Sequence, residues 1–307
     1  MNLPPDRSHI STEKSNPECN NLHQLDAAQV IQEIQRQDHF VIRALEEAQA
    51  QLISLCDKAE KGFKKEGRLI YFGAGTSGRL GVLDASEAPP TFHVSPSKVI
   101  GIIAGGDGSL RKSSEAKEDV DSGAIDELKT LNLNADDTLI GIAAGGTTPY
   151  VHGGLKWAKT LEHPPLTALI TCSGGIKGPY IDEMIYLNTG PEVLTGSTRM
   201  KAGSATKMAL NTISTTLMIR SGRVYGNLMI DVKATNDKLK DRASRIIMQI
   251  THLDRESSFQ LLDQADGKVK TALVMHHLKV TKEEAESKIL CAGQDISQLI
   301  ESHESPE

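Results

Sequence analysis

The chain has 307 residues, with 34 basic and 40 acidic side chains and a formal net charge of −6. Its basic residues are scattered and only 4% of its residues are aromatic, which disfavours a nucleic-acid surface or an aromatic platform for bases. No apolar run approaches the about 20 residues that a membrane-spanning helix needs. The polar N-terminus also lacks the apolar core of a signal peptide, so we expect a cytoplasmic protein without a membrane partner.

The four cysteines are widely spaced and form no C-x-x-C motif, so we expect free thiols. The ten histidines include no H-x-x-x-H pair, so we expect no metal site.

Residues 1–25 are expected to form a loosely ordered lead. From Asp26 to Lys65, apolar residues recur at helical spacing and predict helices with one buried face. Short apolar runs then predict strands at 69–72, 99–103, 138–144, 167–172 and 183–187. Because these runs alternate with helical stretches, they predict a parallel sheet covered by helices on both faces, an α/β fold.

The helices expected after the first two strands run to Pro89-Pro90 and from about 109 to 131. A long helical region is expected from 197 to about 250, and another over about 253–302. We therefore expect an α/β domain over 26–235, N-terminal helices included, and a small all-helical C-terminal segment over 236–307.

The glycine-rich run from Gly73 to Gly78 follows the first predicted strand and leads into a helix. Backbone N–H groups and the positive end of a helix can hold an anion in such a turn, where Thr76 and Ser77 add hydroxyl donors and Gly75 allows a tight backbone. The run also fits the dinucleotide motif G-x-G-x-x-G. That reading needs an acidic residue after the second strand, and Asp107 lies too far along the chain. A phosphate monoester is therefore favoured over a dinucleotide or a bland tight turn.

Hydroxyl residues also follow other predicted strands. Thr147 and Thr148 follow the third strand, and Ser197 and Thr198 precede the long helical region. Any one of them can be a helix N-cap and nothing more. Several at the carboxyl edge of one sheet instead predict a shared phosphate site, since ligands of open α/β sheets bind there. Arg199 and Lys201 can add charge to this site or form surface pairs.

Two carboxylate positions stand out. Glu87 precedes Pro89-Pro90 at the expected end of a helix, where the helix dipole and lost solvation favour the protonated form, so it is a candidate general acid. The alternative is a solvated glutamate at a helix end. Glu115, Glu118 and Asp119 form an acidic cluster that, on residue type alone, is typical of a solvated helix face.

Long motifs resemble the N-acetylmuramic acid 6-phosphate etherase family. They begin with the run from Gly73 to Gly81 and continue as LDASEAPPT from Leu83, TGSTRMKAG from Thr195 and VYGNLMIDV from Val224. The resemblance runs from about residue 26 to 300. It implies a sugar isomerase (SIS) fold, a homodimer and no metal or redox cofactor.

The resemblance also implies a reaction. The lactyl ether of N-acetylmuramic acid 6-phosphate is cleaved, giving N-acetylglucosamine 6-phosphate and D-lactate. The open-chain aldehyde acidifies the C2 proton, a base removes it, lactate leaves from C3, and water then adds there. The family's proton donor falls on Glu87 and its second catalytic glutamate on Glu118, with Glu115 as the competing position. This replaces the solvated-face reading of Glu118.

One loop departs from the family pattern. The family commonly has Ala-Ser-Gly-Arg-Thr-Pro-Tyr after the third strand, whereas this chain has Ala144-Gly145-Gly146-Thr147-Thr148-Pro149-Tyr150. The serine and the arginine are therefore missing, and backbone N–H groups with Thr147 or Thr148 are the expected replacements. Two other functions stay open: an aldose–ketose isomerase of sugar phosphates, and a non-catalytic sugar-phosphate sensor, against which the pair Glu87 and Glu118 argues.

Overall fold

A computed structural model of the chain describes residues 6–112, 117–232 and 236–301. They form two compact units. One comprises the residues up to Ser86 with Pro96–Ser214, and the other comprises Glu87–Ser95 with the residues from Thr215 on. The first unit ends at Ser214, whereas the sequence predicts that the α/β domain ends at residue 235.

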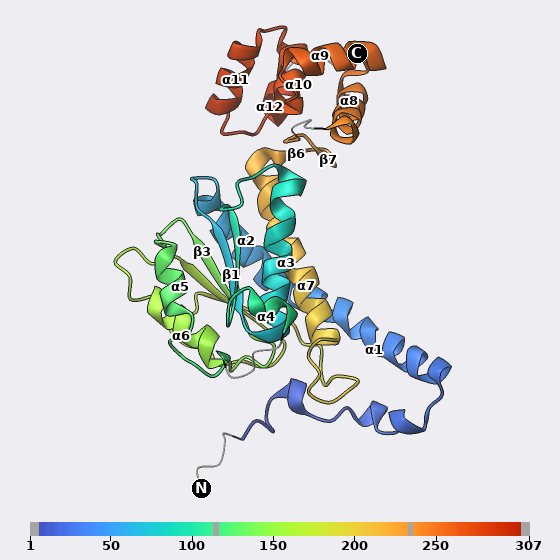
Figure 1. The fold of residues 1–307 in the computed structure, drawn as a ribbon, viewed down its shortest axis with the longest axis vertical. Helices are drawn as coiled ribbons and strands as arrows, with labels where there is room; N and C mark the ends of the chain where they lie inside the picture. The colour runs from blue at the N-terminus through green and yellow to red at the C-terminus, as the bar shows by residue number, and fades with distance from the viewer. Residues whose placement is uncertain (1–5, 113–116, 233–235, 302–307) are drawn as a thin grey trace. The chain divides into compact units, whose positions relative to one another are not determined.

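The first unit is built on a sheet flanked by helices (Figure 1). The sheet has five parallel strands in the order β2-β1-β3-β4-β5. The prediction of a parallel α/β sheet is confirmed, and each predicted strand is found within two residues of its expected bounds. The strands are β1 (Leu69–Gly73), β2 (Val99–Ile103), β3 (Thr138–Ile142), β4 (Leu166–Thr171) and β5 (Glu183–Tyr186).

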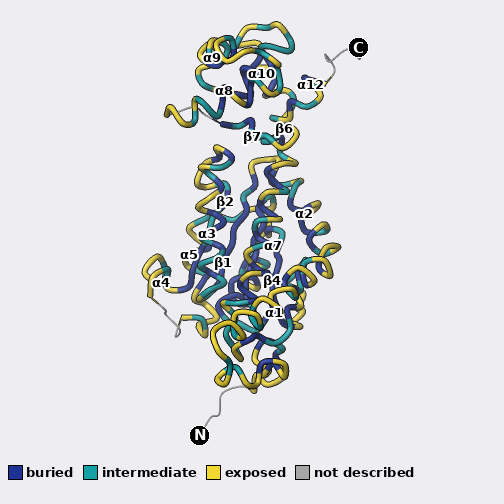
Figure 2. The backbone as a smooth tube through the Cα atoms, turned by 90° about the vertical axis from the view of Figure 1, so that its right-hand side faces the viewer, coloured by how far each residue is buried: buried dark blue, intermediate teal, exposed yellow. Residues whose placement is uncertain are grey.

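Helices cover both faces of this sheet because successive side chains of a strand point to opposite faces. Phe72 of β1 belongs to an apolar cluster with Leu128 and Leu155, on the side of α5 and α6. Tyr71 of β1 lies against Gly81 of α3 on the other side. The central strands are buried throughout (Figure 2). The helices of this unit are α1 (Ala27–Glu47), α2 (Gln49–Phe63), α4 (Gly108–Arg111), α5 (Ile125–Thr130) and α6 (Pro149–Ala158). Most of α3 (Gly75–Phe92) and of α7 (Lys201–Met218) also belongs to it, whereas the ends of these two helices, from Glu87 and from Thr215, belong to the second unit.

Helix α3 does not stop at its two prolines, so the expected helix end there is wrong. The helix continues to Phe92, and the N–H of His93 donates to the carbonyl of Pro89 at 3.0 Å. Proline has no backbone N–H, so Pro90 cannot donate to the carbonyl of Ser86, one turn earlier in the helix. Ser86 is exposed, so water can bond to this carbonyl instead. Glu87 is therefore an exposed residue within the helix, not a residue at its end.

The single helix expected over 109–131 is also wrong. The chain forms α4 and α5 there, and between them Glu118 lies in a turn. Gly123 ends this turn, with its N–H bonded to the carbonyl of Val120 at 2.9 Å. A side chain at Gly123 would meet the ring of Tyr150. Glu115 lies outside the described residues.

Residues 6–25 pack on the first unit instead of forming a loose lead. They contain three short 3₁₀ helices, at Ser11–Glu13, Pro17–Cys19 and Leu22–Gln24. Ile10, Thr12 and Cys19 are buried.

The second unit is mainly helical. The long helix expected over 197–250 is interrupted, because α7 is followed by a turn with Gly222 at φ 73° and by a hairpin of β6 (Val224–Tyr225) and β7 (Leu228–Met229). Its helices are α8 (Asp237–Thr251), α9 (Arg255–Gln264), α10 (Val269–Leu278), α11 (Lys282–Cys291) and α12 (Ser297–Glu301). Ile230 and Val232 join the apolar core of these helices, which explains the early boundary. Within the described ranges, no helix combines the length and the apolar character needed to cross a membrane.

Candidate functional site

The strand order places the expected ligand site between β1 and β3. In a sheet of this order the chain turns to opposite sides after these two strands, which opens a crevice at their carboxyl ends. A cavity of about 270 Å³ lies there. It is lined by Arg7, Ile10, Glu13, Ala74, Gly75, Thr76, Ser77, Glu118, Ile142, Ala144, Gly145, Thr147, Thr148, Gly196 and Thr198.

The turn between β1 and α3 forms one wall. Gly75 has φ 54°, a left-handed conformation that favours glycine. The helix begins at that residue, so the first-turn N–H groups of Gly75, Thr76 and Ser77 have no carbonyl one turn earlier in the helix to bond. Amides at a helix N-terminus, together with two hydroxyls, attract an anion.

The loop between β3 and α6 forms the second wall. Gly146 has φ 72°, and Thr148 is the residue before the helix. The Thr148 hydroxyl makes no capping hydrogen bond, so it is not merely a helix cap. The loop is held by His152, a buried residue of α6, whose Nε2 lies 2.8 Å from the Gly146 carbonyl oxygen and whose Nδ1 lies 3.1 Å from the Tyr180 hydroxyl.

The segment before α7 forms the third wall. The carboxylate of Glu192 accepts the N–H groups of Lys201 at 3.0 Å and of Ala202 at 2.9 Å. Glu192 therefore caps the helix. Thr198 lines the cavity, whereas Ser197 does not.

Lys201 and Glu192 are fully buried beside this wall, and burial shifts both toward their neutral forms. Burial lowers the pKa of Lys201, although the charge of Glu192 opposes this. Burial likewise raises the pKa of Glu192, although the hydrogen bonds that it accepts from two main-chain N–H groups act in the opposite direction. The Lys201 ammonium donates to Gln37 at 2.8 Å and lies over the ring of Phe40. Arg199 is exposed, and neither basic residue lines the cavity.

The two predicted catalytic glutamates are not together. Glu118 lines the cavity, and its main-chain carbonyl accepts the N–H of Tyr150 at 3.0 Å, which ties its turn to α6. Glu87 does not line the cavity. It lies eleven residues after Thr76 on α3, and the rise of an α-helix puts about 16 Å between them.

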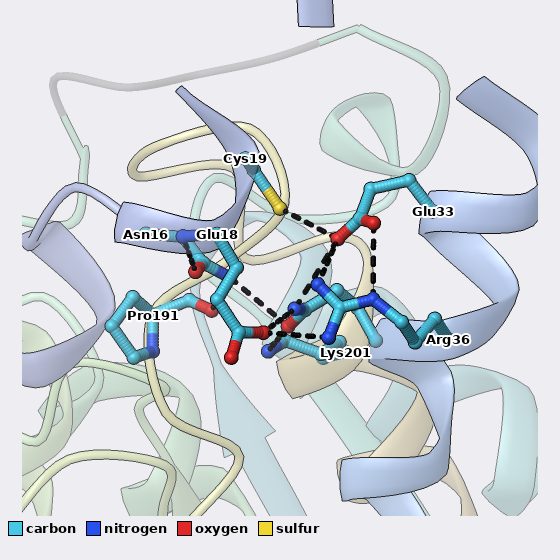
Figure 3. Close-up of polar contacts among 8 residues, drawn as sticks. Asn16, Glu18, Cys19, Glu33, Arg36, Pro191 and Lys201 are labelled. Atoms are coloured by element: carbon cyan, nitrogen blue, oxygen red, sulfur yellow. Dashed lines mark hydrogen bonds and ion pairs between the residues drawn. The ribbon is translucent and has the colours of Figure 1, made fainter. Parts of the chain in front are cut away.

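Sequence reasoning missed the N-terminal segment. Its residues Arg7, Ile10 and Glu13 line the cavity, and the segment is fixed in place by a polar network (Figure 3). The Asn16 amide donates to Gln37 of α1 at 3.0 Å and to the Pro191 carbonyl at 3.3 Å. No periodic pattern marks these residues in the sequence, so only their position in the fold reveals them.

The structure brings most of the residues that the sequence predicts to bind phosphate to one place. Gly75, Thr76, Ser77, Thr147, Thr148 and Thr198 all face one cavity. Besides the N-terminal segment, two features were not foreseen: the buried cap Glu192 and the loop anchor His152. In the part of the chain that the structure describes, no group of three or more His, Cys, Asp or Glu side chains is arranged to hold a metal ion.

The chain is similar to several known proteins. A family model for the N-terminal SIS domain of glucokinase regulatory protein matches residues 51–159. A protein of Parasynechococcus marenigrum named N-acetylmuramic acid 6-phosphate etherase is 47% identical over 91% of this chain and 88% of its own length. Proteins of the same name from Crocosphaera subtropica and Rhodopirellula baltica are 46% and 43% identical, over 91% and 95% of this chain and 91% and 97% of their own lengths. The solved structure of a putative sugar-phosphate isomerase from Listeria monocytogenes matches with a TM-score of 0.44 and 15% identity, over 64% of this chain and 92% of that one.

Proposed function

This chain belongs to the N-acetylmuramic acid 6-phosphate etherase family, and we propose that it cleaves the D-lactyl ether of N-acetylmuramic acid 6-phosphate. The products are N-acetylglucosamine 6-phosphate and D-lactate. One observation carries the proposal: the anion-binding turn and a glutamate, Glu118, face the same cavity.

The 6-phosphate binds at the start of α3. Three main-chain N–H groups and the hydroxyls of Thr76 and Ser77 are available there, and Thr198 lies across from them. A side chain at Gly203 would meet both the Thr198 carbonyl and the Thr76 methyl group, so these two walls are close. Oriented amides at a helix N-terminus stabilise a phosphate without requiring a cation.

Glu118 is the base that removes the C2 proton. It reaches the cavity from the opposite side, on a turn that α6 holds in place. In the open-chain form of the sugar, the C1 aldehyde stabilises the negative charge that develops when C2 loses its proton. The C3–oxygen bond then breaks as the C2–C3 double bond forms, lactate takes the electron pair, and a proton from an acid assists its departure. Water adds at C3 and a proton returns to C2, which restores the sugar.

The acid is Glu87, supplied by a second copy of this chain. Within one copy, the about 16 Å of helix between Thr76 and Glu87 exceeds the span of a sugar phosphate. Glu87 is exposed and thus accessible to a partner. Apolar side chains that a partner would cover are also exposed: Ile31 and Ile42 of α1 and Ile53 of α2 are 55%, 49% and 54% exposed. The assembly is a homodimer with two equivalent sites.

The decisive experiment incubates the purified protein with N-acetylmuramic acid 6-phosphate and measures D-lactate. We expect stoichiometric release of lactate and N-acetylglucosamine 6-phosphate. An intact substrate and no lactate would sink the etherase proposal.

A sugar-phosphate sensor is the second candidate, because the matched family model is that of a regulatory protein's domain. It predicts that N-acetylmuramic acid 6-phosphate binds, as measured by calorimetry, and is recovered unchanged. The isomerase alternative predicts a ketose phosphate from an aldose phosphate such as glucose 6-phosphate, with no lactate from the muramic acid substrate.

A further inference from the structure

The N-terminal segment crosses the carboxyl edge of the sheet and is fixed there. The main-chain N–H of Ser11 donates to the Ser173 hydroxyl at 2.9 Å, and the Ser11 hydroxyl donates to the Cys172 carbonyl at 3.3 Å. Ile10 and Thr12 on either side are buried, at 4% and 0% exposure. The segment is therefore a wall of the cavity and not a tail.

Arg7 brings positive charge to this cavity. Among the lining residues that the structure describes it is the single lysine or arginine, and two carboxylates, Glu13 and Glu118, share the lining. Its guanidinium lies 3.6 Å from the carboxylate of Asp119, with about half or more of both side chains exposed. An exposed pair at this distance contributes little to stability. A bound anion can therefore take the place of Asp119 at low cost.

The loop after β3 lacks a cation of its own. Where the family pattern has an arginine, this chain has Thr147, which lines the same cavity as Arg7. A threonine hydroxyl is uncharged and offers a single donor, whereas a guanidinium carries a positive charge and a fork of donors that matches a carboxylate, so the threonine binds an anion less strongly.

The proposed substrate carries two anionic groups, a phosphate and the carboxylate of the lactyl ether. The start of α3 takes the phosphate. Arg7 approaches from the other side, where its partner Asp119 is the neighbour of Glu118. If Glu118 acts at C2, the lactyl group on the adjacent C3 lies on this same side.

We infer that Arg7 binds the lactyl carboxylate of the substrate and supplies the cation that the Thr147 loop lacks. The inference rests on the proposed function, because only that substrate class brings both anions to the cavity. Arg7 orients the leaving group, so the carboxylate that departs as lactate is held by a guanidinium in a two-pronged geometry.

The test compares two ligands that share the phosphate and differ in the lactyl group. For Arg7→Ala we expect the KM of N-acetylmuramic acid 6-phosphate to rise about tenfold or more. The inhibition constant of N-acetylglucosamine 6-phosphate should stay within about twofold, as should the thermal midpoint. Lys14→Ala, which removes an exposed cation of the same segment outside the cavity lining, is the matched control and should change neither constant.

Two further variants test whether an arginine in the loop after β3 can replace Arg7. The double variant Arg7→Ala/Thr147→Arg should bring the KM most of the way back to the wild-type value. The KM of Arg7→Lys should lie between those of the wild type and Arg7→Ala. Equal weakening of both ligands by Arg7→Ala would place Arg7 at the phosphate or in a structural role, and no weakening of either would remove it from the site. Both results overturn the inference. If the wild type binds the substrate without releasing lactate, the etherase proposal fails, and dissociation constants for the same two ligands still decide the role of Arg7.

Discussion

The carboxylate of Glu192 accepts the main-chain N–H of Ala202 at 2.9 Å and so caps α7 from within the protein. Replacing Glu192 by alanine leaves the buried N–H groups of this helix end without a partner. We expect a loss of about 1–2 kcal/mol in the free energy of unfolding, measured with urea. Because the segment that carries Thr198 leads into this cap, the KM of the substrate should rise as well.

The matched control is Asp254→Ala, which removes an exposed cap from α9 in the other unit, where Asp254 accepts the N–H of Ser257 at 2.8 Å. It should lower stability without changing KM. A Glu192→Ala protein with normal KM would show that the cap does not position the third wall of the cavity.

Glu118→Gln should abolish proton removal at C2. In deuterated water, the wild type should place deuterium at C2 of N-acetylglucosamine 6-phosphate. The variant should form product about a thousandfold more slowly, because the amide cannot accept the proton. The readouts are NMR of C2 and lactate release. Deuterium incorporation at the wild-type rate would assign the base to another group.

Glu87→Gln and Glu118→Gln should complement each other if the acid comes from a second copy. Each variant alone should be nearly inactive. After mixing in equal amounts and re-equilibrating the subunits, half of the dimers are mixed and each has one intact site, so about a quarter of wild-type activity should return. A control mixture of Glu118→Gln with itself should stay inactive. No recovery, with subunit exchange confirmed by differently tagged copies, would mean that Glu87 acts within its own chain or not at all.

Asp182 should make the stability of the first unit depend on pH in the acid range. Burial opposes its ionisation, but hydrogen bonds from the ammonium of Lys159 and from Thr167 outweigh burial and hold the pKa of this carboxyl below its ordinary value of 3.8. A group whose pKa is depressed by folding contributes stability above its unfolded pKa and loses it as the pH falls. Urea unfolding of the wild type should therefore weaken below about pH 4 more than that of Asp182→Asn. Asp126→Asn, which changes a fully exposed carboxylate, is the control and should follow the wild type.

The thiols should react unequally. Cys291 is exposed, whereas the other three cysteines are buried. Burial, with a hydrogen bond to Glu33, raises the pKa of Cys19 to about 11, and burial raises that of Cys172 to about 12. At pH 8 these two are almost wholly protonated, and the thiolate is the reactive form. A disulfide reagent should titrate one thiol quickly, and Cys291→Ser should remove that phase. A fast phase that survives the substitution would contradict the buried placement of the others.

Much of this fold is readable from the sequence because its strands are continuous apolar runs. The run from Leu69 to Phe72 has no helical alternative, being short and followed by glycines. The ends of the helices were harder to predict from the sequence. Pro89 and Pro90 remove donors, but Ser86, whose carbonyl loses Pro90 as its partner, is exposed, and the helix continues to Phe92. The acidic stretch around Glu118 has helical composition, yet Gly123 breaks it by packing against Tyr150, a contact that no local pattern encodes.

The candidate site was likewise predictable in part. Hydroxyls after strands gave Thr76, Thr147 and Thr198, because the carboxyl ends of parallel strands meet at one edge. Arg7 and Glu13 were not predictable, since nothing in a polar N-terminal stretch says which edge of the sheet it will cross. The separation of Glu87 from the cavity follows from the length of α3, and it is visible only once the helix is known to be unbroken.

The contact between Ser11 and Ser173 joins residues that are 162 positions apart. During synthesis, Arg7 and Glu13 leave the ribosome first, but their docking place does not exist until the fourth strand has been made and paired. Contacts of such long sequence separation form late, because the chain must first close a large loop. The cavity thus reaches its final form only after the sheet is assembled, and until then it lacks the wall that carries Arg7 and Glu13.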